Sequence, residues 1–250
     1  MLVLENVSRH FGGLQALSGV NLRVEPQRVV GLIGPNGAGK TTLINNISGL
    51  DHPSSGHILF DGQPIHRRAP HRIARAGVAR TYQNIRLFGE ATTFENVLIG
   101  QHGQGRASML EAIAFWPSFR REERTLRERA RELLAQFDLM DVADVPAANL
   151  PYGAQRRLEM ARALATNPRL VLLDEPTAGM NPSETRALGE QILRLPQMGL
   201  AVLVIEHDMS LIHQVCDEVY VLNFGQIIAH GTPAEVRDDP VVIEAYLGKE

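Results

Sequence analysis

The sequence contains only one cysteine, Cys216, among its 250 residues. A single thiol cannot form an internal disulfide framework, which is typical of a protein that works in a reducing compartment. No companion pattern of nucleophilic or metal-ligating residues surrounds Cys216. We therefore expect it to be a small buried apolar residue and not a catalytic nucleophile.

Long hydrophobic runs are also missing. No apolar stretch approaches the roughly 20 residues that a bilayer-spanning helix needs. The first residues lack the basic region and apolar core of a signal peptide. The sequence thus predicts neither a leader nor a membrane span, and any work at a membrane would depend on another chain holding the protein there.

An excess of positive charge is absent as well. The formal net charge is −3, which argues against a nucleic-acid binder held by bulk charge. Hydrophobic residues make up 44% of the chain and charged residues 21%, as in ordinary globular proteins. A chain of this length can form one large α/β domain with a smaller lobe.

Residues 34–42, Gly-Pro-Asn-Gly-Ala-Gly-Lys-Thr-Thr, fit the phosphate-loop pattern G-x-x-x-x-G-K-[ST]. An apolar strand at 29–33 precedes them, and Leu43, Ile44, Ile47 and Leu50 follow with the spacing of a buried helix face. Glycines let backbone N–H groups surround an anion, and the helix N-terminus adds partial positive charge. Lys40 would reach the β- and γ-phosphates, and Thr41 would help to hold Mg²⁺. The alternative, an ordinary glycine-rich turn, does not explain the flanking strand and helix.

Acidic residues follow a second apolar strand, residues 170–173. The carboxyl edge of a parallel sheet is where such folds bind ligands. Asp174 is suited to hold the metal, and Glu175 to orient or deprotonate the attacking water. His207 follows the next apolar strand, 201–205, where it could contact a γ-phosphate oxygen, although a lone histidine is more often structural.

The remaining pattern mixes strands and helices. Alternating apolar residues predict strands within 2–7 and 17–24, Asp61-Gly62 predicts a hairpin turn, and 219–222 predicts a further strand. From 93 to about 165 the pattern is helical, with an apolar stripe in 118–138 formed by Leu126, Ala130, Leu133, Leu134 and Phe137. Thr232 to Glu235 form a capping box, and a last helix begins at Asp239-Pro240 and stops at Gly248.

In this order the pieces resemble the ATP-binding subunit of an ABC transporter over essentially the whole chain. The resemblance rests on the phosphate loop, Gln83, the loop that opens at Leu150, residues 170–181 and His207. It implies an α/β P-loop NTPase fold with an antiparallel β subdomain and an inserted helical lobe. Residues 1–88 and 165–250 would form the RecA-like core with the antiparallel subdomain, and 89–164 the helical lobe with its signature loop.

The resemblance also implies roles for individual residues. Phe11, by itself only an aromatic beside two glycines, would stack on adenine. Gln83, by itself an ordinary loop glutamine, would contact Mg²⁺ and link the γ-phosphate to the transmembrane partner. ATP in one domain would touch the phosphate loop, comprising Asn36, Gly37, Ala38, Gly39, Lys40, Thr41 and Thr42. It would also touch the signature loop of a second domain, through Tyr152, Gly153 and Gln155.

The signature loop departs from the usual Leu-Ser-Gly-Gly-Gln. Pro151, Tyr152 and Ala154 replace serine, the first glycine and glutamine, while Gly153 remains. Pro151 has neither a hydroxyl nor an N–H, so one bond to the γ-phosphate would be missing. Asn181 likewise stands where aspartate is common. We expect the site completed by this loop to be weaker, and the site built on Lys40 and Glu175 to be intact.

Four segments narrow the resemblance to the G-type ATPase of bacterial branched-chain amino-acid importers: 81–88, 117–121, 152–159 and the ending 245–248. This implies a peripheral protein at the cytoplasmic face of the inner membrane. Its partners would be two permeases, a second ATPase (or a second copy of this chain) and, indirectly, a periplasmic binding protein, with no nucleic acid.

Three alternatives stay open at this point. Urea and short-amide importers have related ATPases. Soluble ABC ATPases of translation, DNA repair or cluster assembly commonly carry two such domains or a long coiled-coil insert, and this sequence shows neither. A P-loop kinase or GTPase would not explain the loop at 150 or His207.

Overall fold

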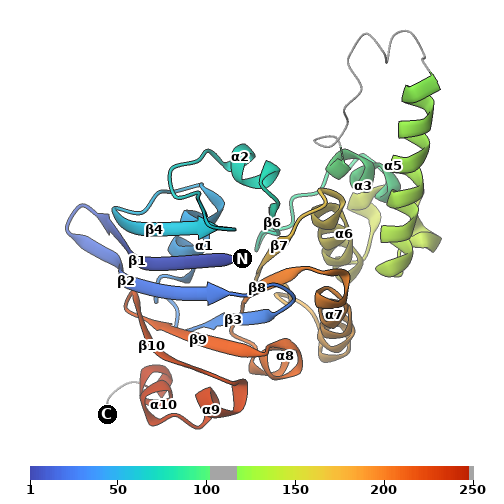
Figure 1. Cartoon of the computed structure of the whole chain (residues 1–250). Coiled ribbons are helices and arrows are strands. Elements are labelled where there is room, and N and C mark those ends of the chain that lie inside the picture. The colour runs from blue at the N-terminus through green and yellow to red at the C-terminus, as the bar shows by residue number, and fades with distance from the viewer. Residues whose placement is uncertain (102–116, 248–250) are drawn as a thin grey trace. The chain divides into compact units, whose positions relative to one another are not determined.

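The structure, a computed structural model, describes the backbone of residues 1–101 and 117–247 (Figure 1). It contains two compact units. Unit 1 comprises Met1–Gln83 with Arg169–Glu250, and unit 2 comprises Asn84–Pro168.

Unit 1 contains a six-stranded sheet whose central strands are parallel. In spatial order the strands are β10 (Gln226–Gly231), β9 (Glu218–Asn223), β3 (Val29–Ile33), β8 (Ala201–Ile205), β7 (Leu170–Asp174) and β6 (Val78–Arg80). β3, β7 and β8 are buried at every residue, which explains their continuous apolar sequences. Because these strands run parallel, their carboxyl ends share one edge of the sheet.

The second sheet of unit 1 is antiparallel and four-stranded. Its strands, in spatial order, are β2 (Leu14–Val24), β1 (Leu2–Phe11), β4 (Ser55–Phe60) and β5 (Gln63–Pro64). The predicted turn at Asp61-Gly62 joins β4 to β5, with both residues at positive φ. The antiparallel subdomain expected from the resemblance is therefore present.

One hydrophobic core joins both sheets of unit 1. Leu4 of β1, Leu32 of β3 and Leu203 of β8 belong to it, as do Leu43 and Ile44 of α1 (Lys40–Ser48). The helix that follows the phosphate loop is thus anchored by its apolar face. The expectation for Leu50 was wrong, because Gly49 ends α1 in a left-handed conformation and leaves Leu50 53% exposed.

The remaining described helices of unit 1 lie in its N-terminal and C-terminal segments (Figure 1). They are α2 (Pro70–Arg75), α7 (Pro182–Arg194), the 3-10 turn η3 (Pro196–Met198), α8 (Met209–Val215), α9 (Pro233–Arg237) and α10 (Pro240–Leu247). The predicted capping box of Thr232 and Glu235 begins α9. The predicted stop of the last helix at Gly248 lies outside the described residues.

Unit 2 is helical, as the sequence predicts. It contains α3 (Thr93–Gln101), α5 (Pro117–Gln136), the 3-10 turns η1 (Met140–Val142) and η2 (Ala147–Asn149), and α6 (Tyr152–Ala165). Ala130, Leu133, Leu134 and Phe137 of the predicted stripe are fully buried. The Arg and Glu residues of α5 form ion pairs three or four residues apart on its exposed face. Of the predicted helical region, residues 102–116 lie outside the described part.

Candidate functional site

The phosphate loop connects β3 to α1, as the sequence predicts. Close backbone packing requires glycine at two of its positions. A Cβ on Gly34, which has φ 153°, would lie 2.0 Å from the Leu222 carbonyl oxygen. A Cβ on Gly39, which has φ 107°, would lie 2.7 Å from the Ala16 carbonyl oxygen. The loop is therefore pressed between β9 and β2, and its shape depends on the absence of side chains there.

Main-chain hydrogen bonds from β2 and from the turn between β9 and β10 also hold the phosphate loop. The Gly225 N–H, in the turn between β9 and β10, donates to the Ala38 carbonyl at 2.8 Å. The Ser18 N–H of β2 donates to the Gly225 carbonyl, also at 2.8 Å. A continuous backbone path thus runs from the antiparallel sheet through Gly225 to the phosphate loop.

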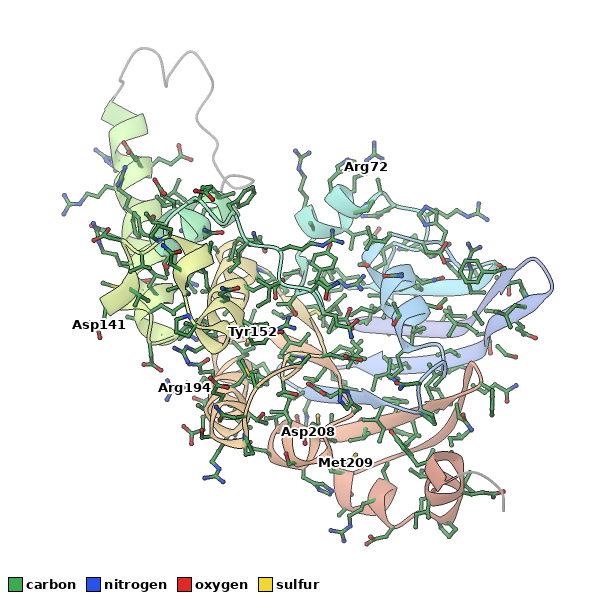
Figure 2. All side chains as sticks on the ribbon, turned by 180° about the vertical axis from the view of Figure 1, so that it is seen from behind. Arg72, Asp141, Tyr152, Arg194, Asp208 and Met209 are labelled. Carbon is green, nitrogen blue, oxygen red and sulfur yellow. The ribbon has the colours of Figure 1, made fainter. Side chains whose placement is uncertain are left out.

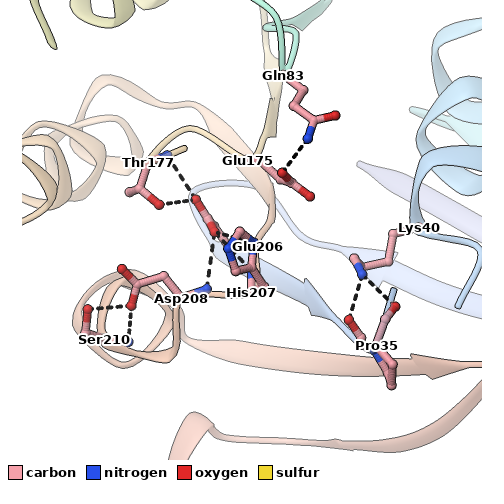
Figure 3. A network of polar contacts seen from close by, with 10 residues as sticks. Pro35, Lys40, Gln83, Glu175, Thr177, Glu206, His207, Asp208 and Ser210 are labelled. Atoms are coloured by element: carbon pink, nitrogen blue, oxygen red, sulfur yellow. Dashed lines mark hydrogen bonds and ion pairs between the residues drawn. The ribbon is translucent and has the colours of Figure 1, made fainter. Parts of the chain in front are cut away.

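Lys40 is the first residue of α1, and its ammonium bends back over the loop. Its Nζ donates to the carbonyls of Gly34 at 2.6 Å and Pro35 at 2.9 Å (Figure 3). Lys40 is only 8% exposed, and burial lowers the pKa of its ammonium from 10.5, an effect that the nearby charge of Glu175 opposes. An ammonium has three donors, so one remains for a phosphate oxygen.

The exposed residues of the loop lie on either side of Lys40. Asn36 and Gly37 are exposed before it, and Thr41 is exposed in the first turn of α1 after it, while Thr42 is half-buried. The Thr41 hydroxyl is therefore accessible to a ligand at the helix N-terminus. This is the position at which the sequence predicts a metal ligand.

Asp174 ends β7, and an arginine holds its carboxylate. Arg80 Nη2, at the end of the neighbouring strand β6, pairs with Asp174 Oδ2 at 2.9 Å. Arg80 Nη1 donates to Asn45 Oδ1 at 2.8 Å and to Ser48 Oγ at 2.9 Å, both on α1. Asp174 is thus tied to the helix that carries Lys40, and its second oxygen, Oδ1, is the one suited to ligation.

Glu175 lies one residue further on and faces Gln83. Gln83 Nε2 donates to Glu175 Oε2 at 2.7 Å (Figure 3). Two residues predicted to share one catalytic site, 92 positions apart in sequence, are thus hydrogen-bonded. Glu175 has φ 47°, a left-handed conformation that a residue with a Cβ rarely adopts.

His207 follows β8 and projects into solvent. Its side chain is 62% exposed, and its Nδ1 lies 3.7 Å from Glu206 Oε2. Its backbone N–H donates to the same Glu206 oxygen at 2.9 Å. The imidazole is therefore accessible to a ligand at the sheet edge, while its main chain is anchored.

Phe11 ends β1 at the tip of the hairpin with β2. Its ring is 47% exposed, and the Arg9 guanidinium lies over it, 4.3 Å from the ring centroid. Arg9 is itself paired with Asp51 at 2.7 Å. A base that stacked on Phe11 would use the part of the ring that Arg9 leaves accessible.

The signature loop belongs to unit 2, where it opens α6. Pro151 is the N-cap of α6 and gives no side-chain hydrogen bond. The Tyr152 hydroxyl, labelled in Figure 2, accepts from Arg156 Nη2 at 2.8 Å. Gln155 Nε2 donates to the Leu150 carbonyl at 2.9 Å, and Gly153 is buried. Tyr152 and Gln155 thus have partners within their own unit.

Residues 17–178 match the family model of the ABC transporter, and residues 226–250 match that of the branched-chain amino acid ATP-binding cassette transporter. The chain belongs to the ABC transporter ATP-binding family. It is an ABC ATPase, and it binds ATP.

Full-length relatives support the assignment. The ATPase is 46% identical to the high-affinity branched-chain amino acid transport ATP-binding protein BraF of Pseudomonas aeruginosa, and 44% identical to LivG of Escherichia coli K12, each alignment covering 100% of this chain and 98% of the relative. A solved nucleotide-free ATP-binding cassette from an ABC transporter matches with a TM-score of 0.86 at 34% identity, over 100% of this chain and 99% of that one. The ADP conformation of an ATP-binding cassette matches with a TM-score of 0.86 at 33% identity and the same coverage. The predicted family and fold are confirmed.

Sequence reasoning missed two residues that contact the candidate site, Arg80 and Glu206. Arg80 lies in a short basic stretch and Glu206 directly before His207, so each has a chemical signal in the sequence. Their partners are 94 and 29 positions away, however, and only the register of neighbouring strands brings them together.

Magnesium fits the oxygen atoms at this edge of the sheet. Within the described part of the chain no three His, Cys, Asp or Glu side chains come together as a metal-binding group. Mg²⁺ does not need such a cage, because it keeps several waters and takes one or two protein ligands together with phosphate oxygens. The Thr41 hydroxyl, Asp174 Oδ1 and the amide oxygen of Gln83 are hard oxygen donors of the required kind.

Proposed function

We propose that this ABC ATPase powers the import of branched-chain amino acids. The observation that carries the proposal is its end-to-end similarity to ATP-binding proteins of high-affinity branched-chain amino acid transport, extended by the family match of its last 25 residues. The phosphate loop, Asp174 and Glu175 supply the groups that ATP hydrolysis needs.

The phosphate loop binds the triphosphate in this proposal. Backbone N–H groups of Asn36, Gly37, Ala38 and Gly39 surround the β-phosphate, and Lys40 donates its remaining N–H to a phosphate oxygen. Thr42 assists from the first turn of α1, and Phe11 stacks on adenine. Thr41, Gln83 and Asp174 would hold Mg²⁺, which would neutralise negative charge on the phosphate oxygens when bound.

Glu175 acts as the general base. It orients the attacking water and accepts its proton while the water oxygen bonds to the γ-phosphorus and the bond to the bridging oxygen breaks. The hydrogen bond from Gln83 fixes the Glu175 carboxylate. Gln83 is the last residue of the first segment of unit 1, and from there it passes the state of the γ-phosphate to a partner. His207 contacts a γ-phosphate oxygen.

The partners in this proposal are two transmembrane permeases, a second ATP-binding subunit or a second copy of this chain, and indirectly a periplasmic binding protein. In the described ranges every helix is too short or too polar to cross a membrane. In this proposal the permeases hold the chain at the cytoplasmic face of the inner membrane. Tyr152, Gly153 and Gln155 complete the ATP site of the second ATPase subunit.

The division of labour follows the expected domains. Residues 1–88 and 165–250 hold and hydrolyse the nucleotide, and 89–164 carry the signature loop. The absence of a hydroxyl and N–H at Pro151 makes the site facing this loop the weaker of two in the assembled transporter.

Uptake by cells tests the substrate. A strain without the chromosomal copy is supplied with the wild-type chain or with Lys40→Ala, and uptake of radiolabelled leucine, isoleucine and valine is measured against urea. Restored uptake of the three amino acids by the wild type alone supports the proposal. Restored uptake of urea, or no uptake difference between the two chains, contradicts it.

Co-purification tests the partners. The tagged chain is isolated from gently solubilised membranes, and the proteins that accompany it are identified by mass spectrometry. We expect two multi-spanning permeases and a second ATPase. Recovery of soluble partners alone would favour a non-transport ABC ATPase instead.

A further inference from the structure

Glu206 is the most deeply buried acid near the site. It directly follows β8, and its exposed fraction is 0%. Among the described residues no Lys or Arg forms an ion pair with it, and the His207 imidazole Nδ1 lies 3.7 Å from Glu206 Oε2. A carboxylate so placed needs other compensation, because burying a charge without partners is costly.

Hydrogen-bond donors from two segments provide that compensation (Figure 3). Glu206 Oε1 accepts from the Thr177 backbone N–H at 2.9 Å and from the Thr177 hydroxyl at 2.5 Å. Oε2 accepts from the backbone N–H groups of His207 at 2.9 Å and Asp208 at 3.3 Å. Each oxygen therefore binds a different segment, and all four partners are donors, which suits an acceptor-only carboxylate.

The two segments carry the proposed catalytic side chains. Thr177 lies two residues after Glu175, and His207 follows Glu206 directly. The Glu175 N–H also donates to the Ile205 carbonyl at 2.9 Å, which ties the start of the same loop to the end of β8. The ends of β7 and β8 are thus joined twice, by this main-chain hydrogen bond and by the hydrogen bonds from Thr177 to the Glu206 side chain.

Backbone strain at Glu175 shows why such a connection matters. Its φ of 47° is a strained left-handed conformation that persists only where the surroundings fix it. Thr177, held at both its N–H and its hydroxyl, restrains the loop that leaves this residue. Released from Glu206, the loop could relax and move the Glu175 carboxylate away from the water that it must orient.

We propose that Glu206 is a positioning residue that, through Thr177 and the His207 main chain, sets Glu175 and His207 in one arrangement for ATP hydrolysis. The inference rests on the proposed function, because it acts on the base named there. Glu206 touches neither nucleotide nor water in this scheme. Its loss should therefore lower kcat and leave the ATP affinity of the Lys40 loop in place.

Steady-state ATPase kinetics of the purified full-length chain test the proposal. Glu206→Gln places an amide NH₂ against N–H donors, and Thr177→Val removes the hydroxyl at nearly constant shape. We expect each to lower kcat by about 10- to 100-fold, the scale of a small misplacement of a catalytic group, with KM for ATP unchanged. Thr177→Ser, which keeps the hydroxyl, should restore most of kcat, and the double variant should be no slower than Glu206→Gln alone.

A matched control is available on α7. Glu190→Gln makes the same acid-to-amide change at an exposed position and should leave kcat unchanged. If Glu206→Gln does not fold, Thr177→Val and Thr177→Ser decide the matter by themselves. A raised KM with normal kcat, or normal kinetics in Thr177→Val, would overturn the inference.

Glu175→Gln, measured beside these variants, separates this inference from the proposed function. If Glu175→Gln is inactive and the Thr177 and Glu206 variants are normal, only the positioning role of Glu206 is wrong. If Glu175→Gln hydrolyses ATP at the wild-type rate, the base assignment itself is wrong and the positioning role is overturned with it.

Discussion

The Glu175 carboxylate is the group on which turnover depends in the proposed mechanism. Glu175→Gln keeps the shape and the hydrogen bond to Gln83 but cannot accept a proton from water. We expect kcat for ATP to fall by at least about 100-fold while ATP still binds, because general-base catalysis contributes on that scale. Phosphate release and the binding of a fluorescent ATP analogue measure the two effects.

The control for this variant is Glu190→Gln, the same change at an exposed position on α7. It should hydrolyse ATP at the wild-type rate. Turnover in Glu175→Gln comparable to that of the control would remove Glu175 from the role of base.

The Cys216 thiol should make the free energy of unfolding depend on pH. The side chain is half-buried and not fully buried as expected, and its removal from water raises the pKa of the thiol from 9.0 to about 12, with a smaller contribution from the charge of Asp217. Between these values the native chain keeps the proton and the unfolded chain loses it. The stability contributed by the thiol is therefore complete below pH 9 and is lost as the pH rises toward 12.

Urea unfolding between pH 8 and pH 11 checks this, with Cys216→Ala as the reference protein. The free energy of unfolding of the wild type should fall relative to the variant as the pH rises. Native Cys216 should also react slowly with iodoacetamide at pH 8. Parallel pH curves for the two proteins would contradict the assignment.

At the scale of the element, α7 depends on its first residues. The Asn181 side chain accepts from the N–H groups of Ser183 and Glu184, and Glu184 bonds back to the Asn181 N–H, which forms a capping box. The sequence suggested that asparagine here is a departure that weakens an ATP site. The structure adds a local role, because Asn181 is an effective helix cap.

Asn181→Ala should therefore lower the free energy of unfolding by about 1 kcal/mol, the usual contribution of an N-cap side chain. Asn181→Asp, which caps equally well, serves as the control and should match the wild type. Chemical denaturation monitored by circular dichroism measures the difference. Equal stability of Asn181→Ala and the wild type would show that the cap is not needed.

Elements of unit 1 were largely predictable, because their apolar runs are short and bounded by glycine, proline or acids. The strands at 29–33, 170–174 and 201–205 were predicted within a residue. The exception at Leu50 is instructive. The spacing of apolar residues predicted that the buried helix face extends to Leu50. In the structure Gly49, in a left-handed conformation, ends the helix before that residue.

Pairings within the site were less predictable. The motifs placed Glu175 and Gln83 in one site, and the structure shows them hydrogen-bonded. The partners of Asp174 and Thr177 could not be read from the sequence, since Arg80 and Glu206 meet them only through strand register. Buried charges need compensation, but the sequence does not say which residue supplies it.

At the scale of the whole molecule, nucleotide binding should stabilise the folded chain. Any ligand that binds only the native state raises the free energy of unfolding, by about 2.7 kcal/mol at a concentration 100 times Kd. We expect ATP with Mg²⁺ to raise the thermal midpoint of the wild type. Lys40→Ala should show little or no shift at the same ATP concentration.

Differential scanning fluorimetry over an ATP titration measures this effect. Arg194→Ala, an exposed change at the end of α7, is the control and should shift like the wild type. An undiminished shift in Lys40→Ala would argue that the nucleotide binds elsewhere.

The backbone path from Ser18 through Gly225 to Ala38 has a consequence for how the protein can vary. Its hydrogen bonds join main-chain atoms, and the Ala16 carbonyl lies close to where a Cβ of Gly39 or Gly225 would be. The exposed side chains at the tip of the hairpin of β1 and β2 can therefore vary without altering the spacing between that hairpin and the phosphate loop. The aromatic side chain of Phe11 can be replaced without moving the phosphate loop. An alanine at Gly39 or Gly225, in contrast, would displace the backbone that joins the hairpin to that loop.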